Sequence, residues 1–259
     1  MAYKEFKLRP GEAVDLFNNW NNDFDPKAKK TEDKKAVTKK AEPKRPRLKK
    51  QNENPFKGGK TMDLSKLDRA ILYAAKAHAG VCRKSTTVPY IVHPVEAMKI
   101  VSSLTENEDV RAAAVLHDTV EDTGTTLADI EREFGAHVAE LVGAQSENKR
   151  EGTPETETWR VRKEEALSHL EKTGRDVKIL YLGDKLANMR DIARDFHALH
   201  EELWKRFNAP DNGQGLSGKA ASIGWYYRGI AERLRPELAD TAAWQEYDAL
   251  VAEVFEQES

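Results

Sequence analysis

The stretch "VLHDTVEDT", residues 115–123, concentrates groups that could do chemistry. It carries His117, Asp118, Glu121 and Asp122 and contains no lysine or arginine. On a helix, residues three or four positions apart share one side, so the carboxylates would crowd about two turns and repel one another. The preceding "AAAVL" is small and apolar, which indicates a buried setting. Buried carboxylates need a counter-charge. We therefore expect a divalent cation, basic side chains from elsewhere in the chain, or protonation of some carboxylates.

Two residues far from this stretch offer further metal ligands. His93 lies in "PYIVHPV" at an expected loop-to-helix junction, and Asp184 is a lone acid inside the apolar run "YLGDKLANM". Because Cys82 is the single cysteine, a cysteine-based metal cage is excluded, whereas imidazole plus carboxylate suits Mn, Fe, Zn or a similar ion. Structural roles stay open: an ion pair of Asp184 with Lys185 or Arg190, and a capping or core hydrogen bond for His93. The remaining histidines are expected to be structural or exposed: His78, His137, His169, His197 and His200.

The elements that must position these groups are helical from residue 62 onward, where apolar residues recur at helical spacing. Pro94 suits a helix N-terminus, Thr125 or Thr126 could cap "LADIEREF", and Gly135 would end that helix. "VKILYLGDKLANM" is apolar enough for a central buried helix. Residues 208–222, "NAPDNGQGLSGKAAS", predict a mobile, Gly-rich polar loop. With no convincing period-two alternation, we expect one all-α domain over residues 62–259.

Composition narrows the class of protein. The chain has 259 residues, of which 39% are apolar and 33% charged. No apolar run approaches the ~18 residues of a membrane span, and the N-terminal "MAYKEFKLRPGEAV" lacks the apolar segment of a secretory signal. The single cysteine rules out an intramolecular disulfide. We expect a cytoplasmic protein without membrane contact.

Charge divides the chain into two parts. Residues 1–61 hold 17 Lys and Arg against 9 Asp and Glu, whereas the rest holds 25 against 35. Residues 26–60 are rich in Lys and Pro and nearly free of aliphatic side chains, which predicts disorder. This basic tail is expected to be a solvated linker, or an arm that weakly contacts nucleic acid or an acidic protein. Residues 12–24 could form a short docking motif or a helix that packs back on the body.

Three motifs occur at fixed spacing, and together they indicate a protein family more specifically than any one of them alone. "Y-x-x-H-P" is followed by "H-D-x-x-E-D-T" 24 residues after its His, and "D-K-L-x-N-M-R" comes 66 residues after the Asp of that second motif. Together with the flanking "RKS" and "DIEREFGAHVAELV", they resemble the hydrolase domain of RelA/SpoT homologues, which belong to the HD phosphohydrolase superfamily. The resemblance covers roughly residues 64–232. It implies an HD-domain helical bundle and a small, hydrolase-only alarmone enzyme.

The resemblance also assigns roles to individual residues. The family's Mn²⁺ ligands fall here on His93, His117, Asp118 and Asp184. Glu121 and Asp122 would hold the attacking water and manage its proton. The implied substrates are guanosine tetra- and pentaphosphate, hydrolysed to GDP or GTP plus pyrophosphate. The implied nucleotide contacts are Arg83, Lys84 and Ser85 of "RKS", with Asn188 at the ribose.

Alternatives remain for the substrate and for the remaining charges. "TTV" separates "RKS" from "PY", where longer family members have a two-residue link. That loop borders the base pocket, so adenosine alarmone analogues and the 2′-phosphate of NADPH stay possible substrates. A nucleotide-sensing module with a docking tail is the other class, although such a sensor has no need of Glu121 and Asp122. Five further basic residues are phosphate candidates, with ordinary surface charge the favoured interpretation: Lys149, Arg150, Arg160, Arg162 and Lys163.

Overall fold

The helices begin where short polar side chains can satisfy the first free backbone N–H groups. Ser65 and Asp68 form a reciprocal capping box at the start of α2 (Lys66–Ala77). Thr126 and Asp129 do the same at α6 (Leu127–Phe134), which ends at Gly135 with φ of 97°. The predicted cap and the predicted end of this helix are both confirmed.

The computed structural model describes residues 64–146, 150 and 152–256, which all fall in the second of the chain's two units, Lys60–Ser259. The described residues form helices and no strand, with an isolated bridge between Cys82 and Pro89, so the all-α prediction is confirmed. Predictions for the basic tail and its docking motif lie outside the described residues. The other elements are α3 (Val92–Ser102), α4 (Glu108–Leu116), α5 (Thr119–Asp122), α7 (Ala136–Gly143), α8 (Glu155–Lys172), α9 (Arg175–Leu199), η1 (His200–Arg206), α10 (Gly215–Leu238) and α11 (Ala242–Phe255).

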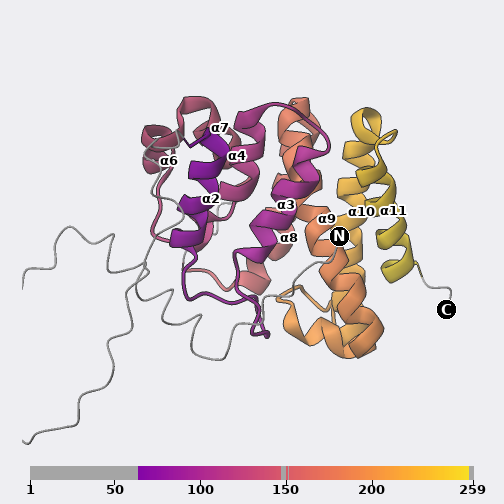
Figure 1. Cartoon of the computed structure of the whole chain (residues 1–259). Coiled ribbons are helices and arrows are strands. Elements are labelled where there is room, and N and C mark those ends of the chain that lie inside the picture. The colour runs from indigo at the N-terminus through magenta and orange to yellow at the C-terminus, as the bar shows by residue number, and fades with distance from the viewer. Residues whose placement is uncertain (1–63, 147–149, 151, 257–259) are drawn as a thin grey trace, which may run out of the picture. The chain divides into compact units, whose positions relative to one another are not determined.

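Helix α9 is the central element of the described bundle (Figure 1). It packs against α3 and α4 on one side and against α10 and α11 on the other, and residues 178–184 are all buried. The prediction of a central buried helix is confirmed. Gly183 lets α9 approach α3 closely, because a Cβ there would lie 2.5 Å from Val101 Cγ2 and 3.0 Å from the Ala97 carbonyl oxygen. This approach fixes the depth at which the next residue, Asp184, sits.

Residues 115–123 do not form the single helix assumed from sequence. Helix α4 ends at Leu116, and α5 starts at Thr119 after Asp118, whose φ and ψ are −87° and −7°. The Thr119 hydroxyl donates to the Leu116 carbonyl at 2.6 Å and so satisfies a free acceptor at the end of α4. The two helices are therefore joined by a tight turn at His117 and Asp118, and the Asp122 N–H still donates to the Asp118 carbonyl at 3.0 Å.

The segment 208–222 is also more regular than predicted. Helix α10 starts at Gly215, so the prediction of an irregular loop is wrong from that residue onward. A Cβ on Gly218 would lie 1.8 Å from the Asp211 carbonyl oxygen, so glycine allows the preceding turn to lie directly on the helix. The Ser222 hydroxyl donates to the Pro210 carbonyl at 2.8 Å and accepts from the Asn212 amide at 3.2 Å. These hydrogen bonds tie the turn to α10.

Among the described residues, no helix is both long and apolar enough to cross a membrane.

Candidate metal and nucleotide site

His117 is held with one ring nitrogen toward two carboxylates. Its Nδ1 lies 2.8 Å from the Ala114 carbonyl and donates to it, so that Nε2 is the nitrogen left to bind a proton or a cation. The buried Nε2 has no hydrogen-bond partner, yet it lies 3.1 Å from Asp118 Oδ2 and 3.7 Å from Asp184 Oδ1. Burial lowers the pKa of His117, but the two carboxylates outweigh burial and raise it well above its usual value. The geometry therefore requires a positive charge between these atoms, either a proton or a cation.

His93 and Asp184 face each other across the packed pair α3 and α9. His93 Nε2 lies 3.2 Å from Asp184 Oδ1 and 3.6 Å from Asp118 Oδ2. One ligand atom each from His93, His117 and Asp184 fall within 4.8 Å of one another, and all three residues are buried. Asp118 Oδ2 adds a second carboxylate beside the same two imidazoles. Two nitrogen and two oxygen donors suit a divalent transition metal, and the orphaned Nε2 of His117 fits such an ion.

Neighbouring side chains orient both carboxylates. The Tyr90 hydroxyl donates to Asp118 Oδ2 at 2.7 Å, and the Asn188 amide donates to Asp184 Oδ1 at 2.6 Å. Lys185 Nζ lies 2.6 Å from Asp184 Oδ2, so the ion pair considered in the sequence analysis is present. It does not replace the contacts of Asp184 with the imidazoles, which use the other carboxylate oxygen. Burial raises the pKa of Asp184, but Lys185 and the two histidines overcome this and hold it well below its usual value.

Arg190, the other partner considered for Asp184, pairs elsewhere. It contacts Glu246 at 2.6 Å and Glu96 at 3.1 Å, which ties α9 to α11 and α3. These ion pairs raise the pKa of Arg190 above its usual value.

Glu121 and Asp122 lie in α5, directly after Asp118. Burial raises the pKa of Tyr90, and the charges of Asp118 and Asp122 raise it further. Asp122 therefore belongs to the same electrostatic cluster as Asp118.

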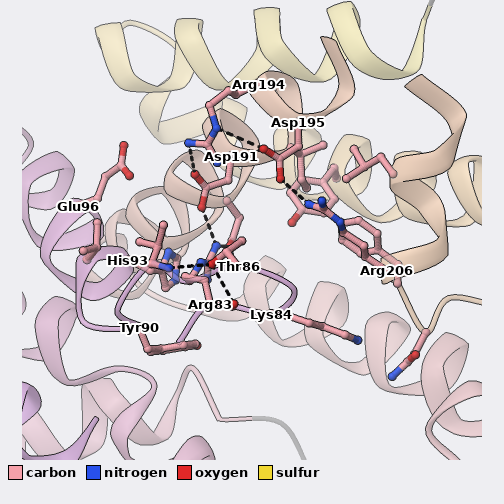
Figure 2. Close-up of a pocket in the computed structure, with 18 residues that line it drawn as sticks. Arg83, Lys84, Thr86, Tyr90, His93, Glu96, Asp191, Arg194, Asp195 and Arg206 are labelled. Atoms are coloured by element: carbon pink, nitrogen blue, oxygen red, sulfur yellow. Dashed lines mark hydrogen bonds and ion pairs between the residues drawn. The ribbon is translucent and has the colours of Figure 1, made fainter. Parts of the chain in front are cut away.

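A cavity of about 640 Å³ opens beside His93, and Arg83, Lys84 and Asn188 are among its other lining residues (Figure 2). The Arg83 guanidinium donates to Asn188 Oδ1 at 3.0 Å and to Asp191 Oδ2 at 2.9 Å. Asn188 thus links Asp184 to Arg83. The structure brings these sequence-predicted residues to one cavity.

Ser85 is not brought to the cavity. It is exposed at a loop tip with φ of 62° and lies outside the residues that line the cavity. The loop is closed by a hydrogen bond from the Arg83 N–H to the Val88 carbonyl at 2.8 Å. Thr86 and Val88 of the "TTV" segment do line the cavity, so this segment forms part of its wall.

The five further phosphate candidates do not gather there. Arg150 lies 2.5 Å from Glu165, and Arg160 lies 2.8 Å from Glu164 and stacks over Trp225. Of the candidates, Arg150, Arg160, Arg162 and Lys163 are absent from the cavity lining, and Lys149 lies outside the described residues.

Sequence reasoning missed two kinds of residue. His78 was expected to be structural or exposed; it is 2% exposed, and the sequence did not indicate that its ring packs 4.8 Å from that of Tyr90 beside the candidate site. Tyr90 stood in the quoted "PYIVHP" motif without a role. The far wall of the cavity was missed too: an alternating series of charges runs along Asp191, Arg194, Asp195 and Arg206. The helical spacing of His78 with Ala74 could have signalled that His78 is buried.

A family model described as an HD domain matches residues 70–209. The ppGpp 3′-pyrophosphohydrolase MESH1 of Danio rerio is 38% identical over 125 residues, which cover 47% of this chain and 66% of that protein. The human MESH1 is 37% identical over 135 residues, 51% of this chain and 72% of the human protein. A GTP pyrophosphokinase of Myxococcus xanthus is 32% identical over 133 residues, but these cover only 17% of its length.

Solved structures share the fold. A metazoan ortholog of SpoT that hydrolyses ppGpp matches with a TM-score of 0.57 at 24% identity, over 75% of this chain and 98% of that one. A protein from Listeria monocytogenes matches with a TM-score of 0.53 at 29% identity, over 66% and 99% of the two chains. Because the HD-domain model matches just over half of the chain and spans His93, His117, Asp118 and Asp184, the chain belongs to the HD-domain family.

Proposed function

We propose that this protein is a metal-dependent 3′-pyrophosphohydrolase of guanosine tetra- and pentaphosphate. Water attacks the phosphorus attached to the ribose 3′ oxygen, that P–O bond breaks, and the products are GDP or GTP and pyrophosphate. One observation carries the proposal: the buried ligand set of His93, His117 and Asp184 adjoins a cavity lined by Arg83 and Asn188. The relatives named for ppGpp hydrolysis support the same substrate.

The cation would be held by His93, His117, Asp118 and Asp184, and we propose Mn²⁺. When bound, such an ion makes water acidic enough to attack near neutral pH and neutralises charge on the phosphoryl group. The protein prepares the site through Ala114, which fixes the tautomer of His117. Lys185 and Asn188 keep the Asp184 carboxylate turned toward the imidazoles.

Other side chains handle the water and the substrate. Glu121 and Asp122 follow Asp118 on α5, and in the proposed mechanism they orient the attacking water and accept its proton. Arg83 and Lys84 would contact the nucleotide's phosphates or base, and Asn188 the ribose. Ser85 would reach the substrate only through its backbone or a movement of the loop, because it is exposed at the loop tip.

The basic tail and the compartment complete the proposal. The excess of positive charge over residues 1–61 supports a weak contact with nucleic acid or an acidic protein, in addition to catalysis. The single, free cysteine Cys82 supports a reducing, cytoplasmic setting.

The direct test is incubation of the purified protein with ppGpp and Mn²⁺, with the products separated by anion exchange. We expect GDP and pyrophosphate in equal amounts, and no turnover with a chelator. A parallel panel of ppApp and NADPH compares kcat/KM between substrates. Bound metal at one equivalent without ppGpp turnover would keep the site and reject this substrate.

A further inference from the structure

His78 is a buried polar group without a hydrogen-bond partner for its ring. It follows the last residue of α2 as the C-cap and is 2% exposed. Neither Nδ1 nor Nε2 has a partner among the described residues. Leaving a buried polar group unpaired costs about 1–3 kcal/mol, so such groups are rare and call for an explanation. A phenylalanine or leucine would fill the same space without that cost.

The surroundings of His78 are polar and belong to the hydrolytic site. Its ring packs against Tyr90 with centroids 4.8 Å apart and an interplanar angle of 31°. The Tyr90 hydroxyl in turn donates to Asp118 Oδ2 at 2.7 Å. Burial lowers the pKa of His78, and the opposing influences come from Asp118 and Asp122. A lowered pKa keeps the ring neutral near pH 7, so that it offers one N–H donor and one acceptor nitrogen.

A neutral imidazole at this place can hold its neighbours without adding charge. A cationic side chain there would compete with the metal for Asp118. An aliphatic side chain would offer no hydrogen-bonding group beside Tyr90. A polar, buried pair of ring nitrogens is also the setting in which an ordered water makes its two to four hydrogen bonds. Such a water would bridge the His78 ring to the Tyr90 hydroxyl, which itself donates to Asp118.

We propose that His78 is a positioning residue of the hydrolytic site, whose ring nitrogens, through an ordered water, hold the Tyr90 hydroxyl on Asp118. This inference rests on the proposed hydrolysis and deepens it. His78 acts through Tyr90 and does not touch the reacting phosphorus. The water would satisfy ring nitrogens that have no partner among the described protein atoms, and this explains why a histidine occupies a buried position beside Tyr90.

The test compares His78→Phe with the wild-type full chain. Phenylalanine keeps a ring of similar size against Tyr90 and removes both nitrogens. We expect kcat for ppGpp to fall at least about tenfold with KM unchanged within about twofold, because only an orienting interaction is lost. We also expect one Mn²⁺ per chain by calorimetry and a Tm close to wild type, because the phenylalanine ring keeps the packing against Tyr90. The control His169→Phe changes an exposed histidine and should leave kcat unchanged.

A double-mutant cycle shows whether His78 acts through Tyr90. If it does, adding His78→Phe to Tyr90→Phe lowers kcat no further than Tyr90→Phe alone. The inference would be overturned if kcat of the double variant fell by the product of the two single losses. An unchanged kcat in His78→Phe would overturn it too. If His78→Phe does not fold, His78→Gln and His78→Leu replace it, and the inference requires the glutamine variant to keep the higher kcat. A wild-type protein that binds Mn²⁺ but leaves ppGpp intact would instead refute the proposed function, and the inference with it.

Discussion

Asp118 and Asp184 both face the two imidazoles, but their other contacts differ. Asp184 is also paired with the largely buried ammonium of Lys185, whose pKa it raises well above the usual value despite the opposing effect of burial. Removing the charge of Asp184 would strand that ammonium, which typically costs about 3–5 kcal/mol. Asp118 has the Tyr90 hydroxyl as its neutral partner. Asp118 is therefore the residue at which function can be separated from folding.

Asp118→Asn should abolish turnover while the fold stays intact. The asparagine carbonyl can still accept from Tyr90, but a negative ligand beside His93 and His117 is lost. We expect kcat for ppGpp to fall at least about 100-fold. Replacing a residue that merely hydrogen-bonds to a metal ligand typically costs about 10–100-fold, and Asp118 is proposed as a ligand itself. Circular dichroism and Tm should stay close to wild type. Unchanged turnover in this variant would refute the metal assignment.

Asn188 connects the two halves of the site, so its loss should affect both. Its amide donates to Asp184 and its carbonyl accepts from Arg83. For Asn188→Ala we expect a loss of about 10–100-fold in Mn²⁺ affinity or in kcat/KM. Calorimetry and steady-state kinetics measure these separately. Gln245→Ala, which removes an exposed amide on α11, is the control, and an equal loss there would contradict the prediction.

At the scale of elements, the contact between α3 and α9 places His93 opposite Asp184. Gly183 makes this contact possible, since a Cβ would meet Val101 at 2.5 Å. Gly183→Ala should therefore push the helices apart. We expect a loss of about 1–3 kcal/mol of unfolding free energy, as for other overpacked cores, together with weaker Mn²⁺ binding. Urea denaturation and calorimetry measure both.

Gly174→Ala is the matched control on the same helix. A Cβ at this N-cap position would meet nothing within 4 Å. Loss of the glycine cap should cost less than about 1 kcal/mol and leave Mn²⁺ binding unchanged. Equal effects of the two substitutions would show that the close approach of α9 to α3 does not explain the result.

Asp109 ties three elements together and gives stability a pH dependence. It lies in the first turn of α4 and pairs with Lys66 of α2 and with His137 of α7. The hydrogen bond from Lys66 holds the pKa of Asp109 below its usual value. Because the folded pKa is lowered, the stabilisation is present above the unfolded pKa and is lost as pH falls through the folded one.

Asp109→Asn should accordingly destabilise the protein at neutral pH and have little effect in acid. We expect about 1 kcal/mol or less at pH 7, since the group is partly exposed. The difference in unfolding free energy between variant and wild type should shrink as pH falls below about 4. A difference that stays constant with pH would show that the ion pairs do not contribute.

At the scale of the whole molecule, local signals predicted the helices better than their junctions. Caps at Thr126 and Gly135 and the apolar run around Asp184 depend on nearby residues, so sequence predicted α6 and α9 correctly. The break between Leu116 and Thr119 depends on how His117 and Asp118 meet residues of other helices, which no local pattern encodes.

The candidate site shows the same division. Motif spacing pointed to His93, His117, Asp118 and Asp184, and the structure places these side chains together. The contact of His78 with the Tyr90 ring was not predicted, because Tyr90 lies in the loop that follows α2. Arg206 was missed because the turn at His200, with φ of 49°, leads η1 back to α9. Such contacts arise only in the assembled bundle.

Residues 1–61 and the remaining chain carry opposite net charges, which predicts that the tail contacts nucleic acid while the rest of the chain carries out hydrolysis. Neutralising the basic residues among residues 27–50 to glutamine in the full chain should leave kcat for ppGpp unchanged. It should remove salt-sensitive binding to RNA or DNA, because each lost phosphate contact lowers the dependence of affinity on salt. Fluorescence anisotropy at rising salt measures this slope beside the hydrolysis assay.

The body carries 35 acidic against 25 basic residues, so nucleic acid should be repelled once the tail is neutral. Binding that persists in this variant would assign it to the HD domain instead, and a fall in kcat would show that the tail takes part in the reaction.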